Sequence, residues 1–106
     1  MPYVPPAFVN QNGFKTAVRK AARKLAPNVV SIVPTFGNDW TGEPAVFFLV
    51  VLADSATQGD QLGSMVSSIS WKVIEQVQPV EKWGVLPYFN YRLESEHARL
   101  DQQIPA

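Results

Sequence analysis

The feature that most constrains the fold is an uninterrupted apolar run, Ala45–Ala53, with the sequence AVFFLVVLA. A membrane-spanning helix needs about 20 apolar residues, so this run is too short to cross a bilayer. It is rich in β-branched and aromatic side chains and does not alternate with polar residues, which predicts a strand covered on both faces. We therefore place it at the centre of a sheet.

Two further β-rich segments accompany this central strand. Val29–Phe36 contains Pro34, and Val85–Leu93 contains Pro87. Because proline cannot donate a hydrogen bond to a neighbouring strand, both segments are expected at the edges of the sheet. The stretch GNDWTGEP at 37–44 is dense in turn-forming residues, so it predicts a hairpin loop between the first two strands.

Helical periodicity predicts two helices. One spans residues 13 to 26, where Asn12 can cap its start and Pro27 follows its end. The other starts after a cap at Thr57 or Asp60 and runs to about Val77. Their apolar stripes are Phe14, Ala17, Val18, Ala21, Ala22 and Leu25 in the first helix, and Leu62, Met65, Val66, Ile69, Val73 and Val77 in the second.

The predicted order is α-β-β-α-β, an α+β open-faced sandwich that corresponds to half of a ferredoxin-like fold. A hairpin pairs the first two strands antiparallel, and a helical crossover returns the third strand parallel to the second, giving a mixed sheet of order 1-2-3. Both helices pack on one face. Residues 1–11 are expected to form an extended arm, 12–93 a single domain and 94–106 a polar tail with at most a short helical turn.

Composition excludes several classes of protein. The chain has 106 residues, enough for one domain, and it contains no cysteine for disulfides, thiol catalysis or thiolate metal sites. Nine acids balance nine bases, so net charge gives no general attraction to nucleic acid or membranes. The first residues resemble neither a secretory signal nor a lipidation motif. We expect a cytoplasmic protein without a cofactor.

The face of the sheet away from the helices is the main indication of function. Whichever face of the central strand is turned outward, it carries four or five apolar residues, and exposing several hundred Å² of such surface forgoes several kcal/mol. We expect a second copy of the chain to cover it, since twofold dimers are the commonest oligomers. The alternatives are another protein, or the arm and tail folding back. The candidate interface residues are Trp40, Phe47, Phe48, Leu49, Val50, Val51, Tyr88, Phe89 and Tyr91.

The charges are segregated along the chain. Residues 1–38 carry five bases and no acid, whereas residues 39–106 carry nine acids and four bases. All five bases fall on the polar side of the first predicted helix: Lys15, Arg19, Lys20, Arg23 and Lys24. This face is interpreted as solvated or paired with the acidic tail, with phosphate-backbone contact as the less favoured alternative because no nucleic-acid-binding motif is present.

Candidate catalytic groups are sparse. Asp39 and Glu43 flank Trp40 in the hairpin loop and are the one carboxylate pair that could serve a small hydrolase or transferase. Aspartate is also a common turn former, so we assign no catalytic residue. His97 is the only histidine and is interpreted as a surface residue, so no metal site is predicted.

Two stretches, GNDWTGEPAVFF at 37–48 and LPYFNYR at 86–92, resemble signatures of a family of short bacterial proteins without an established activity. The resemblance covers residues 28 to 98. The α-β-β-α-β order is also similar to the cytoplasmic C-terminal domains of cation-efflux transporters, which dimerise and bind metal; the histidines that those domains use have no counterpart here. We therefore expect a non-enzymatic interaction or assembly module.

Overall fold

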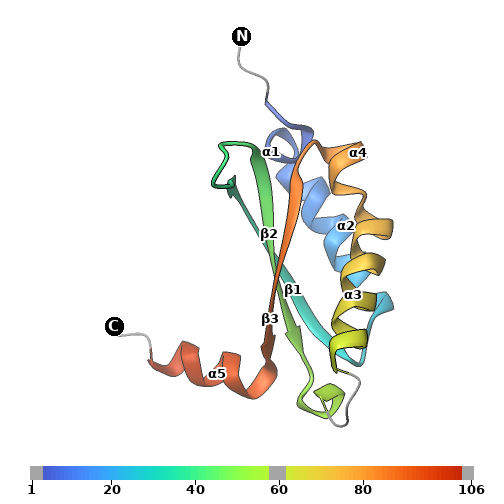
Figure 1. The fold of residues 1–106 in the computed structure, drawn as a ribbon, viewed down its shortest axis with the longest axis vertical. Helices are drawn as coiled ribbons and strands as arrows, with labels where there is room; N and C mark the ends of the chain where they lie inside the picture. The colour runs from blue at the N-terminus through green and yellow to red at the C-terminus, as the bar shows by residue number, and fades with distance from the viewer. Residues whose placement is uncertain (1–3, 58–61, 104–106) are drawn as a thin grey trace.

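The computed structural model describes residues 4–57 and 62–103, and its centre is a three-stranded sheet (Figure 1). The strands are β1 (Val29–Asn38), β2 (Pro44–Leu52) and β3 (Leu86–Leu93). Their order is β1-β2-β3, with β1 antiparallel and β3 parallel to β2. This confirms the predicted α+β architecture, with the two proline-containing strands at the edges.

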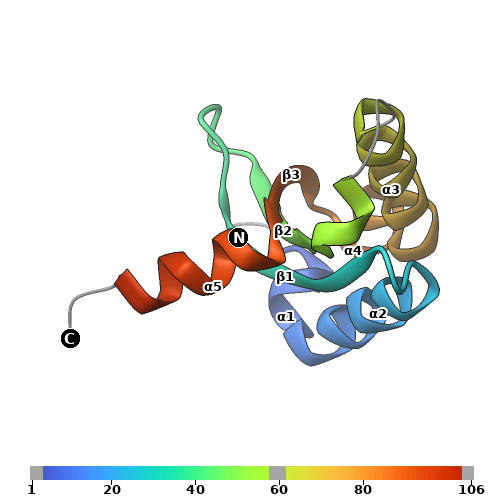
Figure 2. The ribbon, with the colours of Figure 1, turned by 90° about the horizontal axis from the view of Figure 1, so that it is seen from below.

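Two long helices, α2 (Gln11–Lys24) and α3 (Leu62–Val77), lie side by side over one face of the sheet (Figure 2). The short 3₁₀ helix η1 (Asp54–Thr57) follows β2. The start of α2 is capped by Asn10 rather than by the predicted Asn12, because the Asn10 Oδ1 atom accepts a 3.0 Å hydrogen bond from the Gly13 amide. A predicted cap for α3 at Asp60 lies outside the described residues.

The N-terminal segment is not the expected extended arm, because residues 6–9 form helix α1 (Pro6–Val9). Ala7 is completely buried, and the Phe8 ring packs edge-to-face on Phe36 at 5.7 Å. Because Phe36 faces the helices, α1 closes one end of the helix layer and does not cover the opposite face of the sheet. A helix of four residues is too short to show a helical periodicity in the sequence. Its stability comes from tertiary contacts, which a sequence pattern does not reveal.

Two more helices differ from the prediction. Pro79 does not simply end α3 but begins α4 (Pro79–Trp83), which follows a left-handed residue, Gln78. The expected polar tail forms α5 (Glu94–Gln103), and its Ser95 hydroxyl donates a 3.0 Å hydrogen bond to the Asp54 carboxylate. Figure 2 shows α5 extending on the side of the sheet away from α2 and α3.

The core lies between the sheet and the helix layer. Phe14 of α2 is its aromatic centre, because it stacks on Phe48 at 6.0 Å and meets Phe36 and Trp83 edge-to-face at 5.3 and 5.4 Å. The β2 residues that point toward the helices are all buried: Val46, Phe48, Val50 and Leu52. This dense packing fixes the sheet and leaves its other face as a rigid platform.

Candidate interface on the open sheet face

The register of the strands divides the nine predicted interface residues between two faces. Phe48 pairs with Pro34 on one side and with Phe89 on the other, and all point toward the helices because side chains alternate along a strand. Four of the candidates therefore belong to the core, and their assignment to an interface is corrected: Phe48, Val50, Phe89 and Tyr91. The sequence could not separate the two faces because both faces of β2 are apolar, and the faces of β3 depend on its register against β2.

Tyr91 shows how firmly this group is tied to the helix layer. Its hydroxyl donates a 3.1 Å hydrogen bond to the Val66 carbonyl oxygen of α3 and shares a short hydrogen bond with the Ser70 hydroxyl. Burial raises the pKa of Tyr91 above its usual value of 10. The side chain therefore joins β3 to α3 and is not available to a partner.

On the opposite face, the one element among residues 4–57 and 62–103 that packs against the strands is α5, at one end of the sheet. Val51 belongs to this face but is 2% exposed, and the nearby α5 contacts both β2 and β3. Because it is buried, Val51 is removed from the list of interface residues. Four predicted residues remain on the uncovered part: Trp40, Phe47, Leu49 and Tyr88.

Val33 joins these four residues and was not among the predicted interface residues. It is the register partner of Leu49 and is 46% exposed. The signal that could have shown it is the alternation in β1, which places Val33 on the same face as the polar Ser31 and Thr35 and opposite to Ile32 and Phe36. We call the set Val33, Trp40, Phe47, Leu49 and Tyr88 the open-face patch.

An aromatic row forms one end of the open-face patch. The Tyr88 ring stacks on Phe47 at 5.5 Å, and the Trp40 ring meets Tyr88 edge-to-face at 5.7 Å. Trp40 is nevertheless 84% exposed. A large aromatic side chain held by its neighbours yet open to solvent is the type of group that dominates binding energy at interfaces.

Asp39 fixes the loop that carries Trp40. Its Oδ1 atom accepts hydrogen bonds from the Thr41 hydroxyl at 2.6 Å and from the Thr41 and Glu43 amides at 2.9 and 3.0 Å. Its Oδ2 atom accepts a 2.8 Å bond from the Tyr88 hydroxyl, which ties the loop to β3. Gly42, at φ 87°, supplies the left-handed turn that the loop requires.

These hydrogen bonds determine the charge state of Asp39. The Thr41 hydroxyl, the Tyr88 hydroxyl and the two amides favour the carboxylate and lower its pKa from 3.8 to about 2, against a smaller opposing effect of burial. The same contact raises the pKa of Tyr88 above 10. A carboxylate with so low a pKa is a poor general base at neutral pH, so the geometry favours a turn-forming role over catalysis with Glu43.

A hollow of about 560 Å³ adjoins the open-face patch toward α5. Phe47 and Leu49 contribute its apolar lining, while the polar residues come from three elements: Thr35, Asn90, Arg92 and Glu96. The open face therefore combines an apolar centre with a polar margin, as protein interfaces do.

The five bases of α2 are all exposed, as their helical spacing predicts. Within the described part of the chain, the structure gives partners to two of them: Arg19 donates to the Thr16 hydroxyl at 3.1 Å, and Lys24 to the Gln76 side chain at 2.9 Å. Pairing with the described part of the acidic tail is not observed, because α5 lies on the other side of the sheet (Figure 2).

His97 lies half-buried on α5 instead of on the open surface, which corrects its predicted position. Among residues 4–57 and 62–103, no group of three or more His, Cys, Asp or Glu side chains is placed to hold a metal ion. Across the same residues, no helix has both the length and the apolar character that spanning a membrane requires. A comparison with protein-family models and with curated proteins found no match to the chain.

Proposed function

We propose that this protein is a non-enzymatic assembly module of the cytoplasm that dimerises through its open-face patch. The observation that carries the proposal is Trp40, which stays 84% exposed although its loop and ring are held by Asp39 and Tyr88. An aromatic group fixed in this way loses little conformational entropy on binding. Around it, Val33 adds an exposed apolar side chain, and Phe47 and Leu49 add half-buried ones.

The edges of the sheet favour association through its face. Pro34 interrupts β1 and Pro87 interrupts β3, and each removes one backbone donor that an added strand would need. A second copy fits the face because a twofold axis places the same apolar patch on both sides of the contact.

The test is the solution mass, measured by light scattering behind a sizing column. High ionic strength isolates the apolar contact, because the Debye length falls to about 3 Å at 1 M salt. We expect a dimer for the wild type and a monomer for Leu49→Arg, which places a charge at the centre of the patch. The matched control is Val9→Arg, because Val9 is 73% exposed on α1 and lies outside the patch. This control should remain dimeric.

Trp40→Ala supplies a second variant in case Leu49→Arg does not fold. Removing an exposed ring leaves the core intact, and loss of an interface hot spot costs about 2 kcal/mol, a factor of about 30 in the dimer dissociation constant. A wild-type monomer at all concentrations would reject the proposal. So would a folded Leu49→Arg variant, with a wild-type near-UV circular dichroism spectrum, that remains dimeric.

A further inference from the structure

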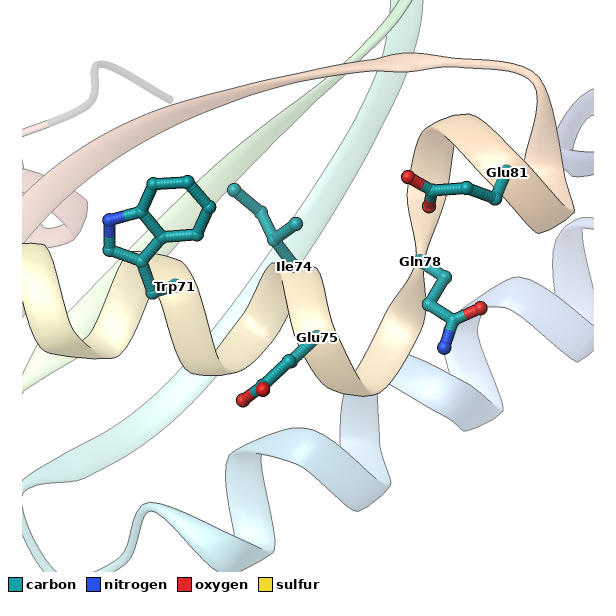
Figure 3. Close-up of a pocket in the computed structure, with 5 residues that line it drawn as sticks. All are labelled: Trp71, Ile74, Glu75, Gln78 and Glu81. Atoms are coloured by element: carbon teal, nitrogen blue, oxygen red, sulfur yellow. The ribbon is translucent and has the colours of Figure 1, made fainter.

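The outer surface of the helix layer carries a second feature that the open-face patch does not explain. A hollow of about 670 Å³ lies where α3 meets α4 and is lined by Trp71, Ile74, Glu75, Gln78 and Glu81 (Figure 3). Trp71 is 69% exposed in the middle of α3, and Ile74 beside it is half-buried. The lining thus joins a large aromatic surface to two carboxylates and contains no base.

The backbone at this junction is unusual. Gln78 has φ 53° and ψ 59°, a left-handed conformation in which glycine normally ends a helix. Figure 3 shows Glu75 and Gln78 on the side of α3 nearer α2, while the Glu81 carboxylate turns back from α4 toward α3. The left-handed turn therefore brings the Glu81 carboxylate to the hollow and leaves the Gln78 side-chain amide at the margin of the hollow.

The same layer carries a hollow of the opposite charge. It measures about 340 Å³, lies between α2 and α3, and is lined by Ala17, Lys20, Arg23, Lys24 and Gln76. Its three bases face no acid in the lining. Gln76 lines this basic hollow and Glu75 lines the acidic one, so the two hollows are neighbours across α3.

We propose that the helix layer docks on the helix layer of a second copy, with Lys20 and Arg23 entering the hollow of Trp71, Glu75 and Glu81. Neighbouring hollows of opposite charge are self-complementary, because a twofold rotation places each basic hollow on the acidic hollow opposite. A guanidinium group can bond to a carboxylate while its plane lies on the indole of Trp71. The contact occurs twice in each pair.

This interface does not depend on the sheet-face dimer, since it uses the other side of the molecule. A chain that makes both contacts binds one copy through its sheet face and another through its helix layer. The resulting assembly is larger than a dimer. The two contacts differ in their response to salt: the helix-layer contact weakens as ionic strength rises, whereas the apolar open-face contact does not.

The experiment uses the full chain with Leu49→Arg, measured by light scattering at low salt, so that only the helix layer can associate. We expect a dimer that dissociates as salt rises. Lys20→Glu with Arg23→Glu, or Glu75→Lys with Glu81→Lys, should each leave a monomer. An equimolar mixture of these two double variants should form a heterodimer. Trp71→Ala should weaken the dimer at least tenfold.

The matched control tests whether net charge alone explains the loss of the dimer in the two hollow variants. Lys72→Glu with Lys82→Glu and Glu43→Lys with Glu94→Lys carry the same pair of net charges, but none of these residues lines either hollow. Because both control variants keep the two hollows unchanged, each should still form a salt-sensitive dimer on its own, whereas each hollow variant alone is a monomer. If Leu49→Arg does not fold, the same variants are made in the wild-type chain. The helix-layer contact is then measured as the increase in solution mass at low salt over the mass at high salt. A mass that is independent of salt and unchanged by both hollow variants would overturn the proposal. So would control variants that are each monomeric alone at low salt, because net charge would then account for the loss of the dimer.

Discussion

The two faces of β2 are equally apolar in sequence but differ in how far they are buried. On the face toward the helices, Val46, Phe48, Val50 and Leu52 are all buried. On the opposite face Val51 is covered near α5, whereas Phe47 and Leu49 remain half-exposed. Apolar character alone therefore does not distinguish a core residue from an interface residue; the elements packed against each face decide it.

The aromatic residues show the same contrast. Phe48 stacks at 5.1 Å on Phe89, with Phe14 on its other side, and this cluster holds the helix layer to the sheet. Among the described residues, Phe47 has one ring contact, its stack on Tyr88, within a row that ends at the exposed Trp40. The Phe48 cluster stabilises the fold of the single chain, whereas the row of Phe47, Tyr88 and Trp40 forms part of the open-face patch.

The largest expected difference between the two faces is in folding stability. Phe48→Ala should lower the free energy of unfolding by about 3–5 kcal/mol, because it leaves a cavity in the centre of the core. Phe47→Ala should cost about 1–2 kcal/mol, because less apolar area is lost from a half-exposed site. Urea unfolding of the two variants under conditions that keep the protein monomeric measures both values. Equal losses would contradict the division into core and surface.

A smaller difference is expected from the two tyrosines of β3. Tyr91→Phe removes the hydroxyl that contacts Val66 and Ser70 and should cost about 1 kcal/mol of folding stability. Tyr88→Phe should change global stability less, because its hydroxyl fixes only the hairpin loop at Asp39. Its main effect should be faster hydrogen exchange of the Thr41 and Glu43 amides. Comparing the two variants by urea unfolding and amide exchange separates a helix-layer contact from a loop contact.

The smallest effect is the pH response of the hairpin loop. The pKa of Asp39 is lowered from 3.8 to about 2, so its contribution to stability is complete above about pH 4 and is lost as pH falls toward 2. Carboxyl NMR should show Asp39 titrating near pH 2, together with a shift of the Trp40 indole N–H signal. In Tyr88→Phe the Asp39 pKa should rise, because one donor to the carboxylate is lost. Titration of the wild-type Asp39 near 4 would show that the loop contacts do not persist in solution.

Much of the fold follows from local patterns. The stripe from Phe14 to Leu25 predicted α2 within two residues at each end, and Pro34 and Pro87 correctly identified the edge strands. These predictions succeed because helical periodicity and the missing proline donor act within one segment of the chain. The short α1 and the position of α5 depend on contacts with distant residues, and local patterns do not contain that information.

The open-face patch could be predicted only in part. Trp40 and Tyr88 were identified, but the contacts of Asp39 with Tyr88 join residues 49 positions apart. Phe48 and Phe47 are adjacent and identical in type, so composition offers no basis for choosing between them. The Trp71 hollow includes Gln78, whose left-handed backbone the sequence around Pro79 did not indicate.

The sequence by itself determined the order of the two long helices and the three strands, the central position of Ala45–Ala53 and the edge positions of the proline-containing strands. Tertiary structure decided which face of the central strand α2 and α3 cover, where α5 contacts the sheet on its other side, and which hollows lie together on α3. The physical reason is the pleat of the strand: residues on both faces are equally apolar here, so only the packing of α2 and α3 on one side breaks the symmetry.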